Sequence, residues 1–168
     1  MSGDAFFTNF LPAPARLFKE EQSTVVWVSP AATGERIVLK LYRHRGLWHA
    51  LRCRVTRYRV QREHERLSHL VQWDVPCTPP RGWSHGYSRE NGFYELLATV
   101  MVPGARDLES HLKNGRECDF RPILAAIRRM HESGLCHHAL YARNILISTV
   151  HAFTDISVER GRHTNGAV

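Results

Sequence analysis

The chain has 168 residues and a formal net charge of +7, from 23 Lys and Arg against 16 Asp and Glu. Hydrophobic residues make up 43% and charged residues 23%, which is typical of a globular protein and excludes a disordered chain. No apolar run approaches the ~18 residues of a membrane span, and the first residues lack the basic-then-apolar pattern of a secretory signal. Cysteines without CxxC spacing indicate reduced thiols, so a cytoplasmic location is predicted.

The N-terminal part of the chain predicts a lead-in followed by a β-hairpin. Residues 1–23 show no sustained hydrophobic period and are predicted to be irregular. Residues 24–28 are β-branched and aromatic, which favours a strand. Turn chemistry at residues 30–34 separates this segment from a second strand at residues 36–42, so the two strands predict an antiparallel hairpin.

A helix is predicted over residues 47–70, because apolar side chains recur there at spacings of three, four or their sums. These side chains are Leu47, Leu51, Val55, Tyr58, Leu67 and Leu70. Prolines at residues 74–82 break this helix. Residues 93–102 then predict one long buried strand or a pair of shorter ones.

The C-terminal half predicts two more helices and a strand. Residues 107–112 predict a short helix, because Lys-Asn-Gly follows them with C-terminal capping chemistry. A longer helix is predicted to start within residues 119–122 and to stop at Gly134. Its predicted apolar face consists of Ile123, Leu124, Ile127 and Met130. An apolar strand is predicted at residues 144–147, with residues 153–156 as its hairpin partner.

Positive charge concentrates in residues 43–66, where eight arginines stand against two glutamates. Guanidinium groups bind phosphate and carboxylate bidentately, so this segment predicts an anionic partner. Nucleic acid, a membrane surface and a phosphorylated glycolipid all fit this chemistry. The alternative interpretation is a solvated helix face whose arginines keep the protein soluble.

Four polar residues beside apolar segments are candidate site residues. Lys40 lies inside an apolar strand, where an ammonium group is costly to bury unless it is paired. Glu63 lies in the predicted helix, Asn144 stands at the start of a strand, and Asp155 ends the next one. Each residue alone also fits a structural role, such as a lysine that snorkels to solvent or a capping aspartate. Their order along the chain resembles that of protein-kinase-like phosphotransferases.

Two segments of the N-terminal half carry this resemblance. Residues 37–40 resemble the lysine strand of the kinase fold, and residues 62–67 resemble its helix C. Glu63 is the preferred pairing partner in helix C, and Glu65 is the alternative. The resemblance implies that Lys40 holds the α- and β-phosphates of ATP and that Glu63 fixes the lysine rotamer through an ion pair.

Two segments of the C-terminal half complete the resemblance. Residues 137–146 match the catalytic-loop pattern His-Arg-Asp-Leu-x-x-x-Asn-Ile-Leu at its His, Leu and Asn, and residues 154–157 resemble the metal-binding Asp segment. The resemblance implies that Asn144 and Asp155 hold Mg²⁺, whose preference for oxygen ligands suits an amide and a carboxylate. It also implies that His137 braces the catalytic loop, to which Asn144 belongs.

Together with residues 101–108, these motifs are similar to the bacterial lipopolysaccharide kinase family, which groups Kdo and heptose kinases of the lipid A inner core with InaA-type proteins. The resemblance covers residues 24–157. It implies a protein-kinase-like α+β fold, with a small antiparallel sheet and helix C over residues 24–102. A reduced or truncated helical C-lobe is expected over residues 103–158, before a frayed tail at residues 159–168.

The resemblance implies an ATP-dependent phosphotransferase related to inner-core sugar kinases. The arginine-rich segment would then contact lipopolysaccharide core at the inner membrane, which predicts a cytoplasmic protein with peripheral membrane contact. Ala139 stands where the pattern has its catalytic Asp, and a general base contributes about 10²–10⁴ in rate. The sequence therefore leaves open an inactive protein that acts as a pseudokinase or scaffold.

Two other classes of function have weaker support in the sequence. A nucleic-acid-binding module would rest on the basic helix and on Trp48 and Tyr58 within it, but no RNP-like, zinc-finger or helix-turn-helix pattern supports that class. A zinc hydrolase would need two histidines four residues apart on one helix face. His64 and His69 are five apart, and their side chains diverge by about 140°, which argues against a zincin site.

Overall fold

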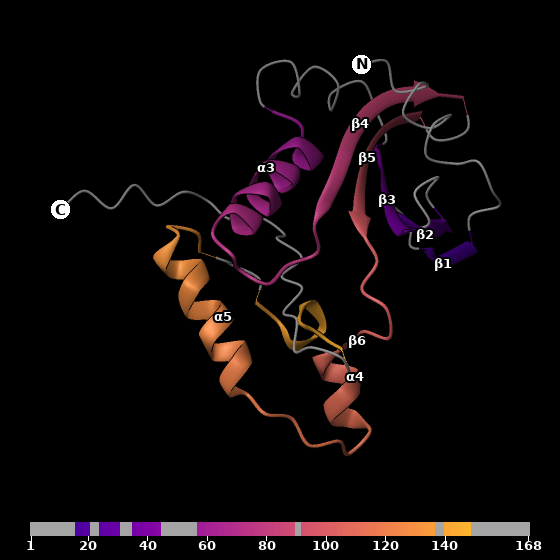
Figure 1. Cartoon of the computed structure of the whole chain (residues 1–168). Coiled ribbons are helices and arrows are strands. Elements are labelled where there is room, and N and C mark those ends of the chain that lie inside the picture. The colour runs from indigo at the N-terminus through magenta and orange to yellow at the C-terminus, as the bar shows by residue number, and fades with distance from the viewer. Residues whose placement is uncertain are drawn as a thin grey trace. The chain divides into compact units, whose positions relative to one another are not determined.

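The computed structural model describes residues 16–20, 24–30, 35–44, 57–89, 92–136 and 140–148 (Figure 1). The chain divides into two compact units, and each is described by itself. The first unit is Met1–Glu65 with Pro79–Met101, and the second is Arg66–Thr78 with Val102–Val168. Within the described ranges, no helix is long and apolar enough to cross a membrane.

The first unit contains a five-stranded antiparallel sheet in the order β1-β2-β3-β5-β4 (Figure 1). The predicted hairpin is confirmed as β2 and β3, which pair with Lys40 opposite Val26. Of the two alternatives predicted for residues 93–102, one long strand or a pair of shorter ones, the structure has the single strand β5. The strands are β1 (Arg16–Glu20), β2 (Thr24–Pro30), β3 (Arg36–His44), β4 (Pro80–Ser88) and β5 (Gly92–Val100).

Two strands of the first unit lie where the sequence predicts none. β1 falls within the lead-in predicted to be irregular, and that prediction is wrong for its five residues. β4 begins inside the break predicted at residues 74–82 and continues to Ser88. Its local sequence is polar and contains two glycines, so its β-propensity is weak. Pairing along almost the whole length of β5 determines that this segment is a strand.

The two faces of the sheet differ in chemistry. Side chains alternate along a strand, and directly paired residues share a face. One face carries polar side chains of β3 and β5, among them Lys40, Tyr42 and Glu95. On the other face a Cβ added to Gly86 would lie 2.7 Å from the Tyr94 hydroxyl oxygen, so this close approach requires glycine. That face holds the apolar core of Ile37, Leu39, Leu41, Tyr94, Leu96 and Ala98.

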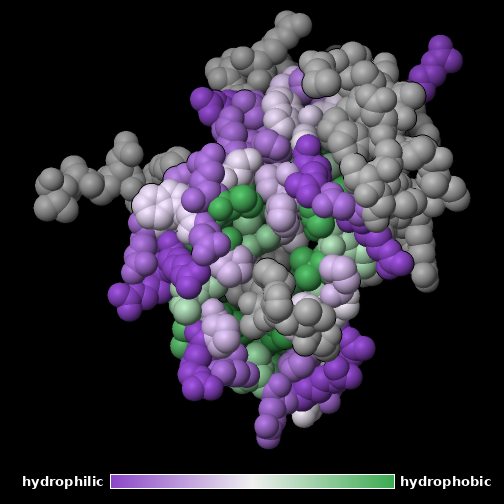
Figure 2. All heavy atoms as spheres, viewed as in Figure 1, coloured by the Kyte–Doolittle hydropathy of each residue, from purple (hydrophilic) through white to green (hydrophobic). Residues whose placement is uncertain are grey.

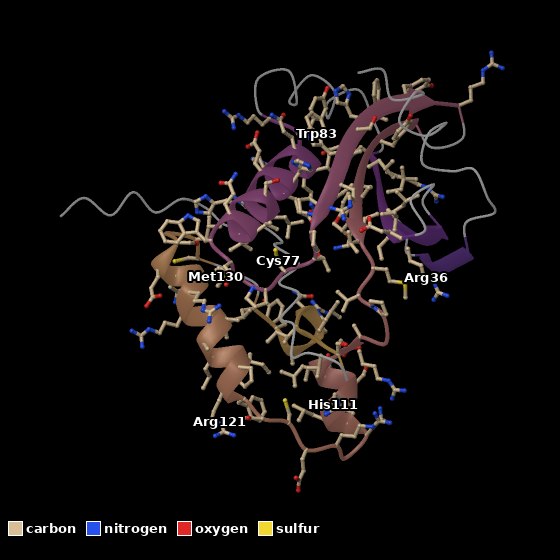
Figure 3. The ribbon with its side chains drawn as sticks, in the orientation of Figure 1. Arg36, Cys77, Trp83, His111, Arg121 and Met130 are labelled. Carbon is tan, nitrogen blue, oxygen red and sulfur yellow. The ribbon has the colours of Figure 1, made fainter. Side chains whose placement is uncertain are left out.

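Helix α3 spans Arg59–Gln72 and begins later than the sequence predicts. Residues 57–58 precede the helix, so the predicted helix is wrong for these two positions, and residues 47–56 lie outside the described ranges. A tertiary contact explains the non-helical start, because the Tyr58 ring stacks on the imidazole of His85 in β4 with centroids 3.8 Å apart. Trp83 of the same strand lies beside this pair (Figure 3).

The second unit packs short elements around a small apolar core. Leu108, Ile123 and Ile145 are its buried members. Hydrophilic side chains gather over the outer surfaces of α4 and α5, and apolar residues lie between them (Figure 2). The elements are α4 (Leu108–Lys113), α5 (Arg121–Glu132), the 3-10 turn η1 (Ala142–Asn144), β6 (Arg106–Asp107) and β7 (Leu146–Ile147).

Both predicted helices of this unit are confirmed, with one correction to the buried face of α5. Arg121 and Met130 mark the two ends of α5 in Figure 3. Leu124 was predicted to belong to the apolar face, but it is 62% exposed, and Ala126 is buried instead. The buried residues Ile123, Ala126 and Met130 follow one another at spacings of three and four residues and so lie on one face of the helix. Leu124 directly follows Ile123 and is therefore turned away from that face by about 100°.

β7 covers only the last two residues of the strand predicted at residues 144–147, and it pairs with a strand that the sequence did not predict. It pairs antiparallel with β6, with Arg106 opposite Ile147. The predicted partner, residues 153–156, lies outside the described ranges. Pairing with β6 joins the segment after Asn144 to the residues that precede α4.

Candidate functional site

The first unit brings Lys40 and Glu63 together. The Nζ atom of Lys40 lies 3.8 Å from Oε1 of Glu63, and their side chains are 21% and 3% exposed. Alternation along β3 places Lys40 on the face opposite the apolar core, while Leu39 and Leu41 fill that core. A carboxylate this deeply buried is costly unless a cation or donor lies beside it, and Lys40 supplies the cation.

The alternative partner, Glu65, lies elsewhere. Its Oε2 atom accepts a hydrogen bond from Nη1 of Arg57 at 2.8 Å, and both side chains are exposed. Positions two apart on a helix point about 200° from each other. The rotation of α3 that directs Glu63 to the sheet therefore directs Glu65 to solvent.

Sequence reasoning missed a second buried carboxylate, Glu95 of β5. Its Oε2 atom accepts the backbone N–H of Val60 at 2.9 Å, and its Oε1 atom lies 3.0 Å from Nε2 of His44. Burial lowers the pKa of the neighbouring His85 below its ordinary value, and the Glu95 carboxylate opposes this shift only in part. The sequence did contain a sign of this site, because Glu95 is a glutamate inside the apolar run of residues 93–102, where a buried charge needs a partner.

Asn144 lies in the second unit, at the end of η1. Its N–H donates to the carbonyl oxygen of Tyr141 at 2.8 Å, and the N–H of Leu108 donates to the carbonyl of Ile145 at 2.8 Å. Leu140, the leucine of the catalytic-loop pattern, packs against the core of this unit. Apolar contacts on both sides of Asn144 therefore hold its backbone in place.

Asp107 caps α4 next to this segment. Its Oδ1 atom accepts the backbone N–H of Ser110 at 2.7 Å. Burial acts to raise the pKa of Asp107, but hydrogen bonds from Ser110 outweigh it and hold the pKa below its ordinary value of 3.8. Because Asp107 also pairs with Leu146 of β7, one residue supports both the helix and the Asn144 segment.

We expect Asp107→Ala to lower the free energy of unfolding by about 1 kcal/mol at pH 7, the usual cost of losing a helix cap. Because the pKa of Asp107 is lowered in the folded protein, its charge adds to the free energy of unfolding in full above pH 3.8, the ordinary pKa of the group. This contribution is lost as the pH falls through the lower pKa of the folded protein. The difference between wild type and variant should therefore shrink in acid. Urea denaturation at neutral and acidic pH measures it, with Asp107→Asn as an uncharged acceptor control. An equal difference at both pH values would contradict this role of the charge.

The remaining predicted site residues lie outside the described ranges. These are His137 and Asp155, together with Ala139 at the position of the catalytic aspartate. Among the residues that are described, no group of three or more His, Cys, Asp or Glu side chains is arranged to hold a metal ion. A magnesium site formed by Asn144 and Asp155 stays a prediction.

A cavity of about 450 Å³ opens within the second unit. Its lining includes Arg106, His111, Arg116 and Cys118, with Ile123 of α5 contributing apolar surface. Asn144 is not among the lining residues. Ile147 and Ser148, which follow the catalytic-loop segment, do line it.

Comparisons with known proteins show the family of the chain and its fold. A model of the lipopolysaccharide kinase (Kdo/WaaP) family matches residues 9–164. The chain is 31% identical over 125 residues to a 3-deoxy-D-manno-octulosonic acid kinase from Actinobacillus succinogenes, an alignment that covers 70% of this chain and 52% of the relative. The chain thus spans about half the length of the curated relative that it matches.

A solved structure identifies the fold. The kinase domain of a maize sucrose-induced receptor kinase, bound to AMP-PNP, matches with a TM-score of 0.58 and 13% identity, covering 89% of this chain and 51% of that one. At this identity the likeness shows the fold alone. The predicted protein-kinase-like α+β fold is confirmed.

Proposed function

This chain belongs to the lipopolysaccharide kinase (Kdo/WaaP) family, and from that premise we propose that it is an ATP-dependent phosphotransferase acting on a sugar of the lipopolysaccharide inner core. The observation that carries the proposal is the Lys40–Glu63 ion pair. It joins a sheet lysine and a helix glutamate in the arrangement that phosphoryl transfer uses to position a triphosphate.

Lys40 is the proposed ligand of the α- and β-phosphates. Phosphoryl transfer depends on positioning and charge neutralisation more than on covalent chemistry, so one fixed ammonium group contributes strongly. Glu63 restricts the ammonium to one side of the β3 strand. Since Lys40 is partly exposed while Glu63 is buried, the lysine can reach a phosphate and keep its carboxylate partner.

Asn144 and Asp155 are the proposed holders of Mg²⁺. An amide oxygen and a carboxylate are the hard oxygen donors that this cation prefers, so the residue types fit. Mg²⁺ would neutralise charge on the triphosphate. The ordered backbone around Asn144 supports this assignment, and His137 is the proposed brace of the same loop.

Ala139 favours a second candidate function. Alanine accepts no proton and orients no hydroxyl, so the acceptor sugar lacks the general base that the catalytic-loop pattern supplies. The chain would then bind nucleotide as a pseudokinase or scaffold, with transfer that is slow or absent. Both candidates share one nucleotide site and differ in turnover.

The proposed acceptor is an anionic glycolipid of the lipopolysaccharide core, with contact at the membrane surface. The described arginines of residues 43–66 support part of this surface. Arg62 is exposed, whereas Arg57 is engaged by Glu65 and the Arg59 guanidinium lies 4.2 Å from the centroid of the Tyr42 ring. The Glu65 carboxylate offsets the charge of Arg57, and the contact with Tyr42 restricts Arg59 without changing its charge. A smaller free patch than the sequence suggests therefore supports the proposal.

A thermal-shift titration with MgATP tests the nucleotide site. A ligand that binds the folded state at 100 times its Kd stabilises it by about 2.7 kcal/mol, so Tm should rise with MgATP and less with ATP plus EDTA. Asp155→Asn should abolish the magnesium dependence. Glu65→Gln, on the same helix as Glu63 but facing solvent, should respond like wild type. No shift at millimolar MgATP would refute the proposal.

A further inference from the structure

Glu95 is a charged residue in the most apolar strand of the sheet. It is 1% exposed and is flanked in β5 by Tyr94 and Leu96, both of which belong to the apolar core. Taking a carboxylate out of water is expensive, and such a group persists where specific partners offset the cost. Specific polar partners of Glu95 must therefore offset the cost of its burial.

The contacts of Glu95 lie at the start of α3. The first N–H groups of a helix have no partner within the helix, and a negative charge near them interacts favourably with the helix dipole. Helix α3, all of whose residues are described, has no acidic residue in its first turn. Glu95 supplies the missing negative charge from the sheet, because Val60 donates its N–H to Oε2 of Glu95 at 2.9 Å. The other oxygen, Oε1, lies 3.0 Å from Nε2 of His44 in β3.

This anchor is one helical turn from the ion pair. Val60 and Glu63 are three residues apart, so both face the sheet. On the sheet, Glu95 pairs with Tyr42 and Lys40 pairs with Leu97, which puts Glu95 and Lys40 on the same face of adjacent strands. The carboxylate that fixes the helix start and the lysine that meets Glu63 therefore share one surface.

We infer that Glu95 is a positioning residue that fixes the rotation and axial position of the first turn of α3, so that Glu63 stays opposite Lys40. Without the anchor, the first turn can fray or rotate, and a rotation that turns Glu63 away from the sheet separates it from Lys40. The consequence for nucleotide binding rests on the proposed function, but the effect on the ion pair does not.

Trace acetylation of lysines in the nucleotide-free protein tests the ion pair directly. The lysines of the chain are Lys19, Lys40 and Lys113, and the exposed Lys113 serves as internal reference. In Glu95→Ala the Lys40/Lys113 labelling ratio should rise by at least about twofold, the lower bound for coupled neighbours. Glu95→Gln keeps an oxygen for the Val60 N–H and should restore part of the protection. Circular dichroism confirms that each variant is folded.

Ile37→Val is the matched control, because it loosens the core on the other face of the sheet. An unchanged labelling ratio in Glu95→Ala, or an equal rise in Ile37→Val, would overturn the inference. A double-mutant cycle extends the test: Glu95→Ala should weaken MgATP binding in the wild type and add little in Glu63→Gln. If wild type binds no MgATP but Lys40 labelling still rises in Glu95→Ala, the proposed function fails and the positioning role stands.

Discussion

Replacing Ala139 with aspartate is expected to raise the rate of phosphoryl transfer by about 10²–10⁴-fold, the usual contribution of a general base. The residue occupies the position of the catalytic aspartate in the loop pattern, next to Leu140, which packs in the core of the second unit. A carboxylate at this position can accept the proton of the attacking sugar hydroxyl. The measurement is transfer of labelled γ-phosphate from MgATP to a lipid A acceptor that carries 3-deoxy-D-manno-octulosonic acid.

Ala139→Asn is the matched control for this experiment. Asparagine has nearly the shape of aspartate but does not accept a proton at neutral pH, so its turnover should stay at the level of the wild type. Equal turnover in the Asp and Asn variants, with MgATP binding intact in both, would contradict the role of Ala139. A wild type that already turns over rapidly would refute the pseudokinase candidate.

The second large effect concerns the ion pair itself. Lys40→Met is expected to lower the free energy of unfolding by about 1–3 kcal/mol, because it removes the ammonium group 3.8 Å from the buried Glu63 carboxylate. The double variant Lys40→Met/Glu63→Met should recover most of this loss, since replacing both partners by apolar side chains of similar length is often close to neutral. Urea denaturation at pH 7.5 measures both values.

MgATP binding separates structure from function in the same variants. The double variant should regain stability yet show no thermal shift with MgATP, because its phosphate-binding ammonium is absent. A double variant no more stable than Lys40→Met would argue against the ion pair as the source of the loss. A double variant that binds MgATP as well as wild type would assign the phosphates to other residues.

Much of the order of elements follows from local sequence. The β2–β3 hairpin, the single strand β5 and the two helices of the second unit arise from β-branched runs, turn residues and apolar periodicity, which act over a few residues. The family was recognisable for a similar reason. A catalytic-loop pattern is a contiguous string, and its His, Leu and Asn stand at fixed spacing in residues 137–146.

Other features depended on contacts between distant segments. The polar, glycine-containing β4 is a strand because β5 offers it a ladder of hydrogen bonds, and no local property of residues 80–88 announces this. Helix α3 starts at Arg59, next to Tyr58, whose ring stacks on the imidazole of His85. The N–H of Val60 in its first turn donates to Glu95, which lies 35 residues further along the chain. Local periodicity predicted a helix across residues 57–58 because it contains no information about such partners.

The sequence by itself determined that a lysine strand and a glutamate helix occur in kinase order, since residue type and spacing are written in the chain. The resemblance to helix C already favoured Glu63 over Glu65, but only the tertiary structure places the Glu63 carboxylate beside Lys40 and the Glu65 carboxylate beside Arg57, because the rotation of a helix depends on contacts with other elements. The tertiary structure also decided the burial of Glu95, a charge whose cost is offset by the N–H of Val60, with the His44 imidazole 3.0 Å away. Local sequence specifies which groups are present, and only folding brings together those that stabilise one another.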